Sequence, residues 1–331
     1  MSGFIVFAVV PTGMVSPATL PPDTALPAAL RLVEGRAFSA IGCPAPAGGL
    51  AGLERGALLP WLLAAQSVTE HLMTLGTALP VSLGSVIEDE ARLAWVLRCG
   101  APVLRAAFEA VLARREMNLS VRWPIQSIVA ETLATLPAEM KADAAAGAQA
   151  ARAEVARRLE LEIAGKRGAI RRRIAERLEG LTADRILTLP ADPAGVVDLA
   201  LLLDPAGEGR LDEALEALDA EFGGRLTFRL VGPLAPYSFA TVHLTVPTRQ
   251  QLASARALLG VSEGDAPEAV TAAYRRAARR VHQDLAAVRA EAGAVELSEP
   301  DEMVVVTQAY RTLRAEREPI TVKRQETQTE H

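Results

Sequence analysis

Aromatic residues, cysteines and long apolar runs are all scarce in this sequence. Aromatic side chains make up only 4% of the 331 residues, so Leu, Val and Ala must build the hydrophobic cores. The two cysteines, Cys43 and Cys99, are far apart and have no cluster of His, Asp or Glu beside them, which excludes a metal site visible from the sequence and indicates reduced thiols. No apolar run approaches the roughly 18 residues that a membrane-spanning helix needs. We therefore expect a cytoplasmic protein without a membrane segment.

The charge and the length narrow the class of protein further. A net charge of −5 gives no general reason to expect nucleic-acid binding. Half of the residues are hydrophobic and the mean hydropathy is +0.18, which excludes disorder as the main state. The chain is long enough for two or three domains. Its apolar start at 3–10 is ended by Pro11 and Gly13 too early for a signal peptide, so we expect a buried first strand there.

Residues 1–125 are predicted to form a first α+β domain. Strands are expected at 3–10, 31–42, 79–84 and 117–123. The first helix is expected at 58–75, between the second and third strands. Gly76 is well placed to end this helix. The acidic residues 88–90, which follow Ser85, predict the start of a second helix because carboxylates favour helix N-termini. The order β-β-α-β-α-β is typical of an α+β fold.

Residues 126–247 are predicted to contain a helical connector and a second α+β domain. Apolar residues between Val155 and Leu178 recur on one helical face. Strands at 196–203, 225–231 and 238–246, with a helix at 209–222, are expected to close a modified ferredoxin-like sheet with the preceding helix. Residues 248–316 are helical by pattern, and the polar tail at 317–331 is expected to be flexible.

The most informative segment is 232–239, with the sequence Gly-Pro-Leu-Ala-Pro-Tyr-Ser-Phe. It lies between the apolar runs 226–231 and 241–246, so we expect a loop between two buried strands. Its two prolines fix φ and remove backbone donors, which makes the loop rigid. Tyr237 and Phe239 are two residues apart and point to one side if this stretch is extended.

Three segments in order resemble the gas vesicle protein F/L family. They are Arg-Leu-Val-Glu at 31–34, Leu-Pro-Val-Ser-Leu-Gly-Ser-Val at 79–86, and the Gly-Pro segment at 232–239. With the strand at 117–123 they extend over most of residues 1–246. In the second segment, Ser82 and Leu83 replace the Arg and Phe that are usual in the family, so a family role for that arginine does not transfer.

The resemblance implies a non-enzymatic accessory protein of gas vesicle assembly, without a cofactor. It implies two α+β domains, of which the second is a modified ferredoxin-like fold. It also implies partners among the gas vesicle proteins, above all the small hydrophobic shell protein, whose wall it helps to nucleate or chaperone in the cytoplasm. The rigid segment with Pro236, Tyr237 and Phe239 is a candidate contact for that partner, because rigid aromatics anchor interfaces. The alternative is that both aromatics belong to the core.

The last part of the chain resembles a J-domain, the module by which co-chaperones stimulate a heat-shock ATPase. The resemblance rests on a basic run at 274–281, the triplet His282, Gln283 and Asp284, and the segment Gln-Ala-Tyr-Arg-Thr-Leu at 308–313. It implies a partner-facing set that consists of the triplet together with Arg275, Arg276, Arg279 and Arg280. The alternative is an exposed face of arginines that pair with Glu268 and other acids.

The J-domain family has a proline where this chain has Gln283. Proline holds φ near −65° and removes a donor, which sets a sharp turn after the basic helix. Glutamine removes both constraints and lets the helix continue. We therefore expect a J-like fold with weak or absent stimulation of an ATPase.

No enzyme is recognisable in the sequence. Ser82 lies in half of a nucleophile elbow, but Pro80 occupies the position of the required glycine. His71 and His243 could supply a base, but a histidine at either position is more often an ordinary core or surface residue. No phosphate-binding loop is present in the sequence. The gas vesicle accessory role is the main hypothesis, a J-domain co-chaperone with a client-adaptor front half is the alternative, and a hydrolase that uses Ser82 is the third.

Overall fold

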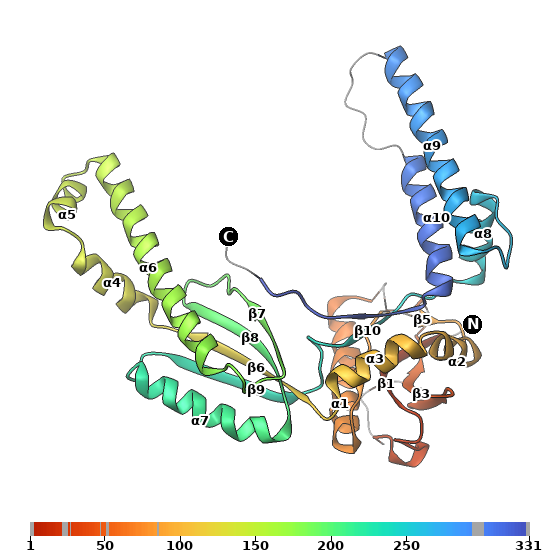
Figure 1. The fold of residues 1–331 in the computed structure, drawn as a ribbon, viewed down its shortest axis with the longest axis horizontal. Helices are drawn as coiled ribbons and strands as arrows, with labels where there is room; N and C mark the ends of the chain where they lie inside the picture. Colours follow the sequence, from red (N-terminus) through yellow and green to blue (C-terminus); the bar gives the residue numbers. More distant parts are fainter. Residues whose placement is uncertain are drawn as a thin grey trace. The chain divides into compact units, whose positions relative to one another are not determined.

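The computed structural model describes residues 3–21, 26, 28–46, 48–50, 53–84, 86–292 and 301–328, without the side chains of 283–292, 301 and 302. The chain divides into two units (Figure 1). Unit 1 comprises Met1–Ala110 and Thr241–Lys323, and unit 2 comprises Val111–Ala240 and Arg324–His331. Both are mixed α/β, and their sheets are built from antiparallel strand pairs.

Strand β1 (Phe4–Pro11) is an inner strand of the sheet in unit 1 and pairs with three other strands. The strand order is β2-β3-β1-β4, and β5 also pairs with β1. The other strands are β2 (Arg31–Glu34), β3 (Phe38–Pro44), β4 (Leu79–Pro80) and β5 (Val86–Ile87). Every residue from Phe4 to Val10 is buried, so both faces of the sheet are covered. The prediction of a buried first strand is confirmed.

Helices cover this sheet in unit 1. Helix α1 (Arg55–Leu75) shares a core with β1 through Trp61, Val68 and Leu72. Two helices follow β5, namely α2 (Glu90–Cys99) and α3 (Ala101–Val111), and a short 3-10 helix η1 (Pro17–Thr19) follows β1. The ring of Phe108 in α3 stacks on that of Phe38 in β3, with 5.1 Å between the ring centroids.

Both predicted helix boundaries of unit 1 are confirmed. Gly76 follows α1 and donates its N–H to the carbonyl of Leu72. The carboxylate of Asp89 accepts from the N–H of Arg92 at 2.7 Å and caps α2. Ser85, which precedes this acidic start, lies outside the described residues.

The prediction of one strand at 31–42 is wrong. The structure has a hairpin in which β2 pairs with β3, so the chain reverses between Glu34 and Phe38. Gly35 donates its N–H to the carbonyl of Phe38 at 3.0 Å and closes the turn. A Cβ at position 35 would clash with the carbonyl oxygen of Phe38 in the same turn and would also lie 3.2 Å from Cβ of Leu97 in α2, so this tight turn requires glycine.

Unit 1 ends in a helical segment held between two short strands. The elements are β10 (Thr241–Leu244), α8 (Arg249–Leu259), α9 (Pro267–Ala292), α10 (Asp301–Arg317) and β11 (Ile320–Lys323). The helices share a small apolar core, and the half-buried ion pair of Arg256 with Glu316 joins α8 to α10 at 2.6 Å. The 317–331 tail was expected to be flexible, but it contains β11, because Ile320 is buried and the strand pairs with β10.

Unit 2 contains a four-stranded sheet in the order β7-β8-β6-β9. Its elements, in chain order, are β6 (Arg115–Arg122), α4 (Ile125–Thr135), α5 (Ala138–Ala145), α6 (Gln149–Arg177), β7 (Asp184–Thr188), β8 (Gly195–Leu203), α7 (Pro205–Glu221) and β9 (Thr227–Leu234). Met117, Leu119 and Val121 alternate along β6 and share a core with residues of α6 and α7, such as Ile174 and Leu211.

Two strand assignments around unit 2 differ from the sequence analysis. The strand predicted at 117–123 was placed in the first domain, but β6 pairs with β8 and β9 as an inner strand of unit 2. Alternation along a strand indicates which face is buried but not which strands lie beside it. The strand predicted at 238–246 is only β10, which pairs with β11 in unit 1. Strand β7 was not predicted.

A buried carboxylate connects β6 to the segment after β9. The side chain of Glu116 is 1% exposed and lies opposite Leu202 and Leu234 in the neighbouring strands. Its carboxylate accepts from both the N–H and the hydroxyl of Ser238, each at 2.7 Å. Burial raises the pKa of Glu116 above the ordinary value of 4.5, and the hydrogen bonds from Ser238 and Asn118 oppose this shift.

The first prediction concerns this link. Glu116→Ala leaves the N–H of Ser238 buried without an acceptor, so we expect the free energy of unfolding to fall by about 2–3 kcal/mol. Urea denaturation followed by circular dichroism measures it. Glu213→Ala, at an exposed position of α7 in the same unit, is the matched control and is expected to change stability by at most about 0.5 kcal/mol. Equal effects of the two substitutions would contradict the structure.

The second prediction is a pH dependence. Because the pKa of Glu116 is raised in the folded state, its contribution to stability is full below the unfolded pKa and is lost as pH rises through the folded pKa. The difference in unfolding free energy between the wild type and Glu116→Gln should therefore move in favour of the variant as the pH rises above the ordinary glutamate pKa of 4.5. Urea midpoints measured below and above that pH test this. A difference that is independent of pH, or that moves the other way, would refute it.

Candidate functional site

The Gly-Pro segment at 232–239 contains the end of β9 and a tight turn, so the predicted loop begins only after Leu234, and no residue of β9 is buried although a buried strand was expected. Strand β9 continues to Leu234, and the N–H groups of Phe239 and Ala240 both donate to the carbonyl of Pro236, at 3.2 and 2.9 Å. Tyr237 and Phe239 therefore do not lie on one side of an extended stretch. Residues 235–240 connect β9 to β10. The hydrogen bonds from Ser238 to the carboxylate of Glu116 hold this connection against β6.

Burial divides the three residues proposed as a contact. Pro236 and Phe239 are buried, and Tyr237 is half-buried. The core alternative considered for the aromatics therefore describes Phe239 better than a surface anchor does. Partner binding by this set stays a prediction, and Tyr237 is its accessible member.

Residues after β11 complete this region of unit 2, which the sequence analysis did not foresee. The guanidinium of Arg324 donates to both carboxylate oxygens of Asp184 in β7, at 2.9 and 3.0 Å. It also lies 6.0 Å from the ring centroid of Phe239. The N–H of Gln325 donates to the carbonyl of Ser238 at 2.8 Å. No local pattern at 324–328 signals these contacts, because their partners are far away in the sequence.

The basic residues singled out in the J-like segment lie on α9. Arg275, Arg276, Arg279 and Arg280 are all exposed, at spacings that place them along one side of the helix. Among the described residues none of the four forms an ion pair, so the pairing with Glu268 that the alternative proposed is absent there. This stretch is a cationic helix surface.

Helix α9 continues through the His-Gln-Asp triplet without a turn. His282 is exposed, and the backbone of Gln283 and Asp284 is helical. This agrees with the expectation that Gln283 lets the helix extend. The side chains of Gln283 and Asp284 lie outside the described residues.

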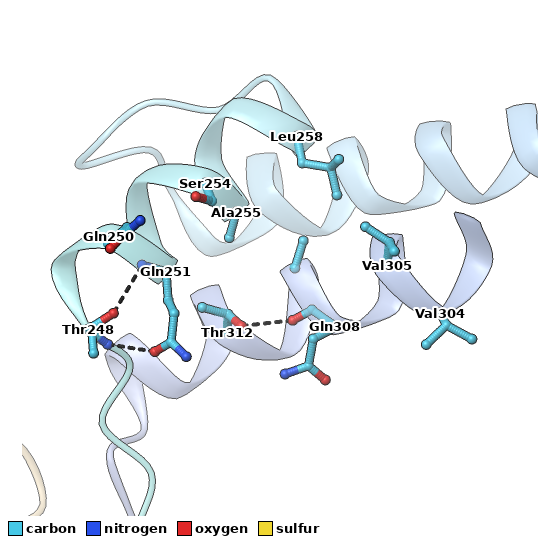
Figure 2. A pocket seen from close by; sticks show the side chains of 11 residues that line it. Thr248, Gln250, Gln251, Ser254, Ala255, Leu258, Val304, Val305, Gln308 and Thr312 are labelled. Atoms are coloured by element: carbon cyan, nitrogen blue, oxygen red, sulfur yellow. Dashed lines mark hydrogen bonds between the residues drawn. The ribbon is translucent and has the colours of Figure 1, made fainter. Parts of the chain in front are cut away.

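A groove of about 690 Å³ runs between α8 and α10 in unit 1 (Figure 2). Eleven residues line it, and all are uncharged. Ala255 and Ala309 belong to the buried core of the helices and also line this groove. At one end Leu258, Val304 and Val305 are 47%, 57% and 50% exposed. The sequence analysis missed this groove, because its two walls are far apart in the chain.

A second apolar surface lies on the outer side of α1 in unit 1. Leu59, Leu62 and Leu63 are 54%, 53% and 56% exposed, and their spacing of three and four residues places them together on the helix. We call these three residues the leucine patch. The opposite side of α1 is the buried one. The helix is therefore apolar on both sides near its start, which is typical of a helix with a partner.

The remaining candidates give no catalytic arrangement. Nε2 of His71 lies 2.8 Å from the carbonyl oxygen of Thr19, and no hydrogen bond from the hydroxyl of Ser82 to His71 or His243 is present in the described part of the chain. Within the same residues there is no group of three potential metal ligands. None of the described helices is both long and apolar enough to cross a membrane.

Two solved structures share the fold of this chain. The chain is similar to the crystal structure of the gas vesicle protein GvpF from Anabaena sp. PCC7120, with a TM-score of 0.63, 18% identity, and coverage of 72% of this chain and 98% of that one. It is also similar to GvpF from Microcystis aeruginosa, with a TM-score of 0.57, 19% identity and the same coverage. No curated protein matches. At this identity the likeness concerns the fold.

The family match extends over the five-stranded sheet of unit 1 and the four-stranded sheet of unit 2. The model described as gas vesicle synthesis protein GvpL/GvpF matches residues 3–241, more than half of the chain, and ends where β10 begins. Helices α8–α10 lie beyond the matched residues. The resemblance stated from the three sequence segments is confirmed, and the chain belongs to the gas vesicle GvpL/GvpF family.

Proposed function

We propose that this chain is a non-enzymatic accessory protein that binds the hydrophobic gas vesicle shell protein in the cytoplasm and helps to nucleate or chaperone the vesicle wall. Membership of the family supports a role in gas vesicle assembly. A shell subunit exposes apolar surface before assembly and aggregates unless it is held. A protein that holds it needs an exposed apolar surface of its own.

The leucine patch on α1 is the observation that carries this proposal. Full burial of an exposed leucine contributes about 1.5–3 kcal/mol, and these leucines are a little over half exposed, so each can still contribute about 0.8–1.6 kcal/mol to holding an apolar partner. The buried side of α1, with Trp61 and Leu72, anchors the helix on β1 and keeps the patch in place. A rigid apolar patch of this kind is typical of an interaction site.

Two finer fold assignments belong to the same proposal. The chain order β6-α-β7-β8-α-β9 with the spatial order β7-β8-β6-β9 supports a ferredoxin-like second domain. The core shared by α8–α10, with the rings of Tyr274 and Tyr310 stacked at 4.5 Å, supports a J-like module at 248–316. Tyr237 is the residue of the Gly-Pro segment best placed for a partner, since Pro236 and Phe239 are buried.

A second function has one observation in its favour. The exposed arginines on α9 have no ion-pair partner among the described residues, as a docking surface for an acidic ATPase requires. The continuous helix at 282–284 argues against it, because the turn that a proline sets is absent. We therefore place co-chaperone activity second.

The third prediction tests the leucine patch. Replacement of Leu59, Leu62 and Leu63 by Gln should reduce co-purification of the major shell protein with the tagged full-length chain by at least about tenfold, because one lost apolar contact of 1.4 kcal/mol already gives that factor. Leu161→Gln, at a 57% exposed leucine of α6, is the matched control and should leave co-purification unchanged. Retention of the shell protein by the triple variant would refute the proposal.

The fourth prediction concerns the alternative. The full-length chain should stimulate a heat-shock ATPase less than about twofold, since the helix does not break at Gln283. His282→Gln should then have no effect on the rate of ATP hydrolysis. Strong stimulation that His282→Gln abolishes would instead establish the co-chaperone function.

A further inference from the structure

The groove between α8 and α10 differs in chemistry from the rest of these helices. Both helices carry charged residues elsewhere, such as Arg256, Arg314 and Glu316, yet the eleven described side chains that line the groove are uncharged. Its floor contains the small residues Ala255 and Ala309, which allow close approach of another backbone. A surface of this kind disfavours a charged occupant, because the charges would lose water without gaining a partner.

The dimensions of the groove suit an α-helix. Val304 and Ala315, at the two ends of the hollowed side of α10, are eleven residues apart, or about 17 Å along the helix axis. The three helices α8, α9 and α10 share one core, so a helix laid against α8 and α10 completes a four-helix arrangement. The leucine and valines at one end offer the apolar contacts that such a helix needs (Figure 2).

The other end of the groove has a single charge. A second hollow of about 430 Å³ shares Gln251, Gln308 and Thr312 with the first, and among the residues whose side chains the structure describes Arg311 is the only charged one that lines either hollow. The C-terminus of an α-helix carries a partial negative charge, which a cation stabilises. This charge distribution therefore favours one direction for the occupant, with its C-terminus towards Arg311.

We propose that the α8–α10 groove docks an amphipathic α-helix of a partner protein, with an apolar, uncharged contact face and its C-terminal end beside Arg311. The side-chain amides of Gln250 and Gln308 have no hydrogen-bond partner among the described residues, and they are available to polar residues on the sides of that helix. The site lies beyond the residues that the family model matches, and it is separate from the leucine patch on α1. It gives this chain a second docking surface.

The fifth prediction uses a synthetic peptide and the full-length chain. The probe is a fluorescent, helix-forming 14-residue peptide with Leu on one face, Ala, Ser and Gln elsewhere, and two Glu at its C-terminal end. Fluorescence anisotropy should show saturable binding. Leu258→Gln combined with Val305→Gln should weaken binding at least tenfold, while Leu161→Gln should not. Arg311→Gln should weaken this peptide more than a second peptide that carries the two Glu at its N-terminal end.

Three results would overturn the proposal. The first is equal binding of a peptide of the same composition in scrambled order. The second is loss of binding in the Leu59, Leu62 and Leu63 variant, which would indicate unspecific adhesion to apolar surface. The third is self-association of the wild-type chain in sedimentation that the Leu258 and Val305 substitutions abolish, which would make a second copy the occupant. Peptide binding by a chain that fails to retain shell protein would support the groove and refute only the leucine patch.

Discussion

One buried carboxylate determines where the chain leaves the second sheet. Glu116 sits in an inner strand, out of contact with water, and Ser238 satisfies both of its oxygens. An unsatisfied carboxylate at this depth is costly, so the segment after β9 must return to β6 before β10 begins. The carbonyl of the same serine accepts from Gln325, which fixes the end of the described chain as well. The turn at Pro236 and the burial of Phe239 follow from this constraint.

How far the sequence predicts the fold depends on whether a signal is local. The buried strand β1, the end of α1 at Gly76 and the acidic start of α2 follow from short-range patterns and are found. The hairpin β2–β3, the partners of β6 and the strand β11 depend on pairing between distant segments, which local patterns do not encode. The same holds for the candidate site. The Gly-Pro segment can be recognised from local sequence, whereas its contact with Glu116 cannot, because Glu116 is 122 residues from Ser238.

The two apolar surfaces of unit 1 have different origins. The leucine patch belongs to a helix within the residues that the GvpL/GvpF model matches, and the α8–α10 groove belongs to helices beyond them. The patch consists of exposed leucines on a helix that its buried side anchors, so it suits an apolar partner surface. The groove combines apolar residues at one end with small side chains and amides elsewhere, and its described lining is uncharged, so it selects by shape and by the absence of charge. If both proposals hold, the chain has two separate surfaces for two different apolar partners.

The return of the last residues to β7 has a consequence for the order of folding. Arg324 and Asp184 are 140 residues apart, and the strand that Ile320 begins closes on β10 only after all three helices have been synthesised. During synthesis, the contacts of unit 2 are therefore complete only when nearly the whole chain has left the ribosome. The strands of its sheet, which end at Leu234, emerge much earlier. Helices α8–α10 thus lie between two segments that pair with each other, β10 and β11, and are not a free C-terminal extension. A premature stop between β10 and Arg324 would remove these contacts from a sheet whose own strands are all present.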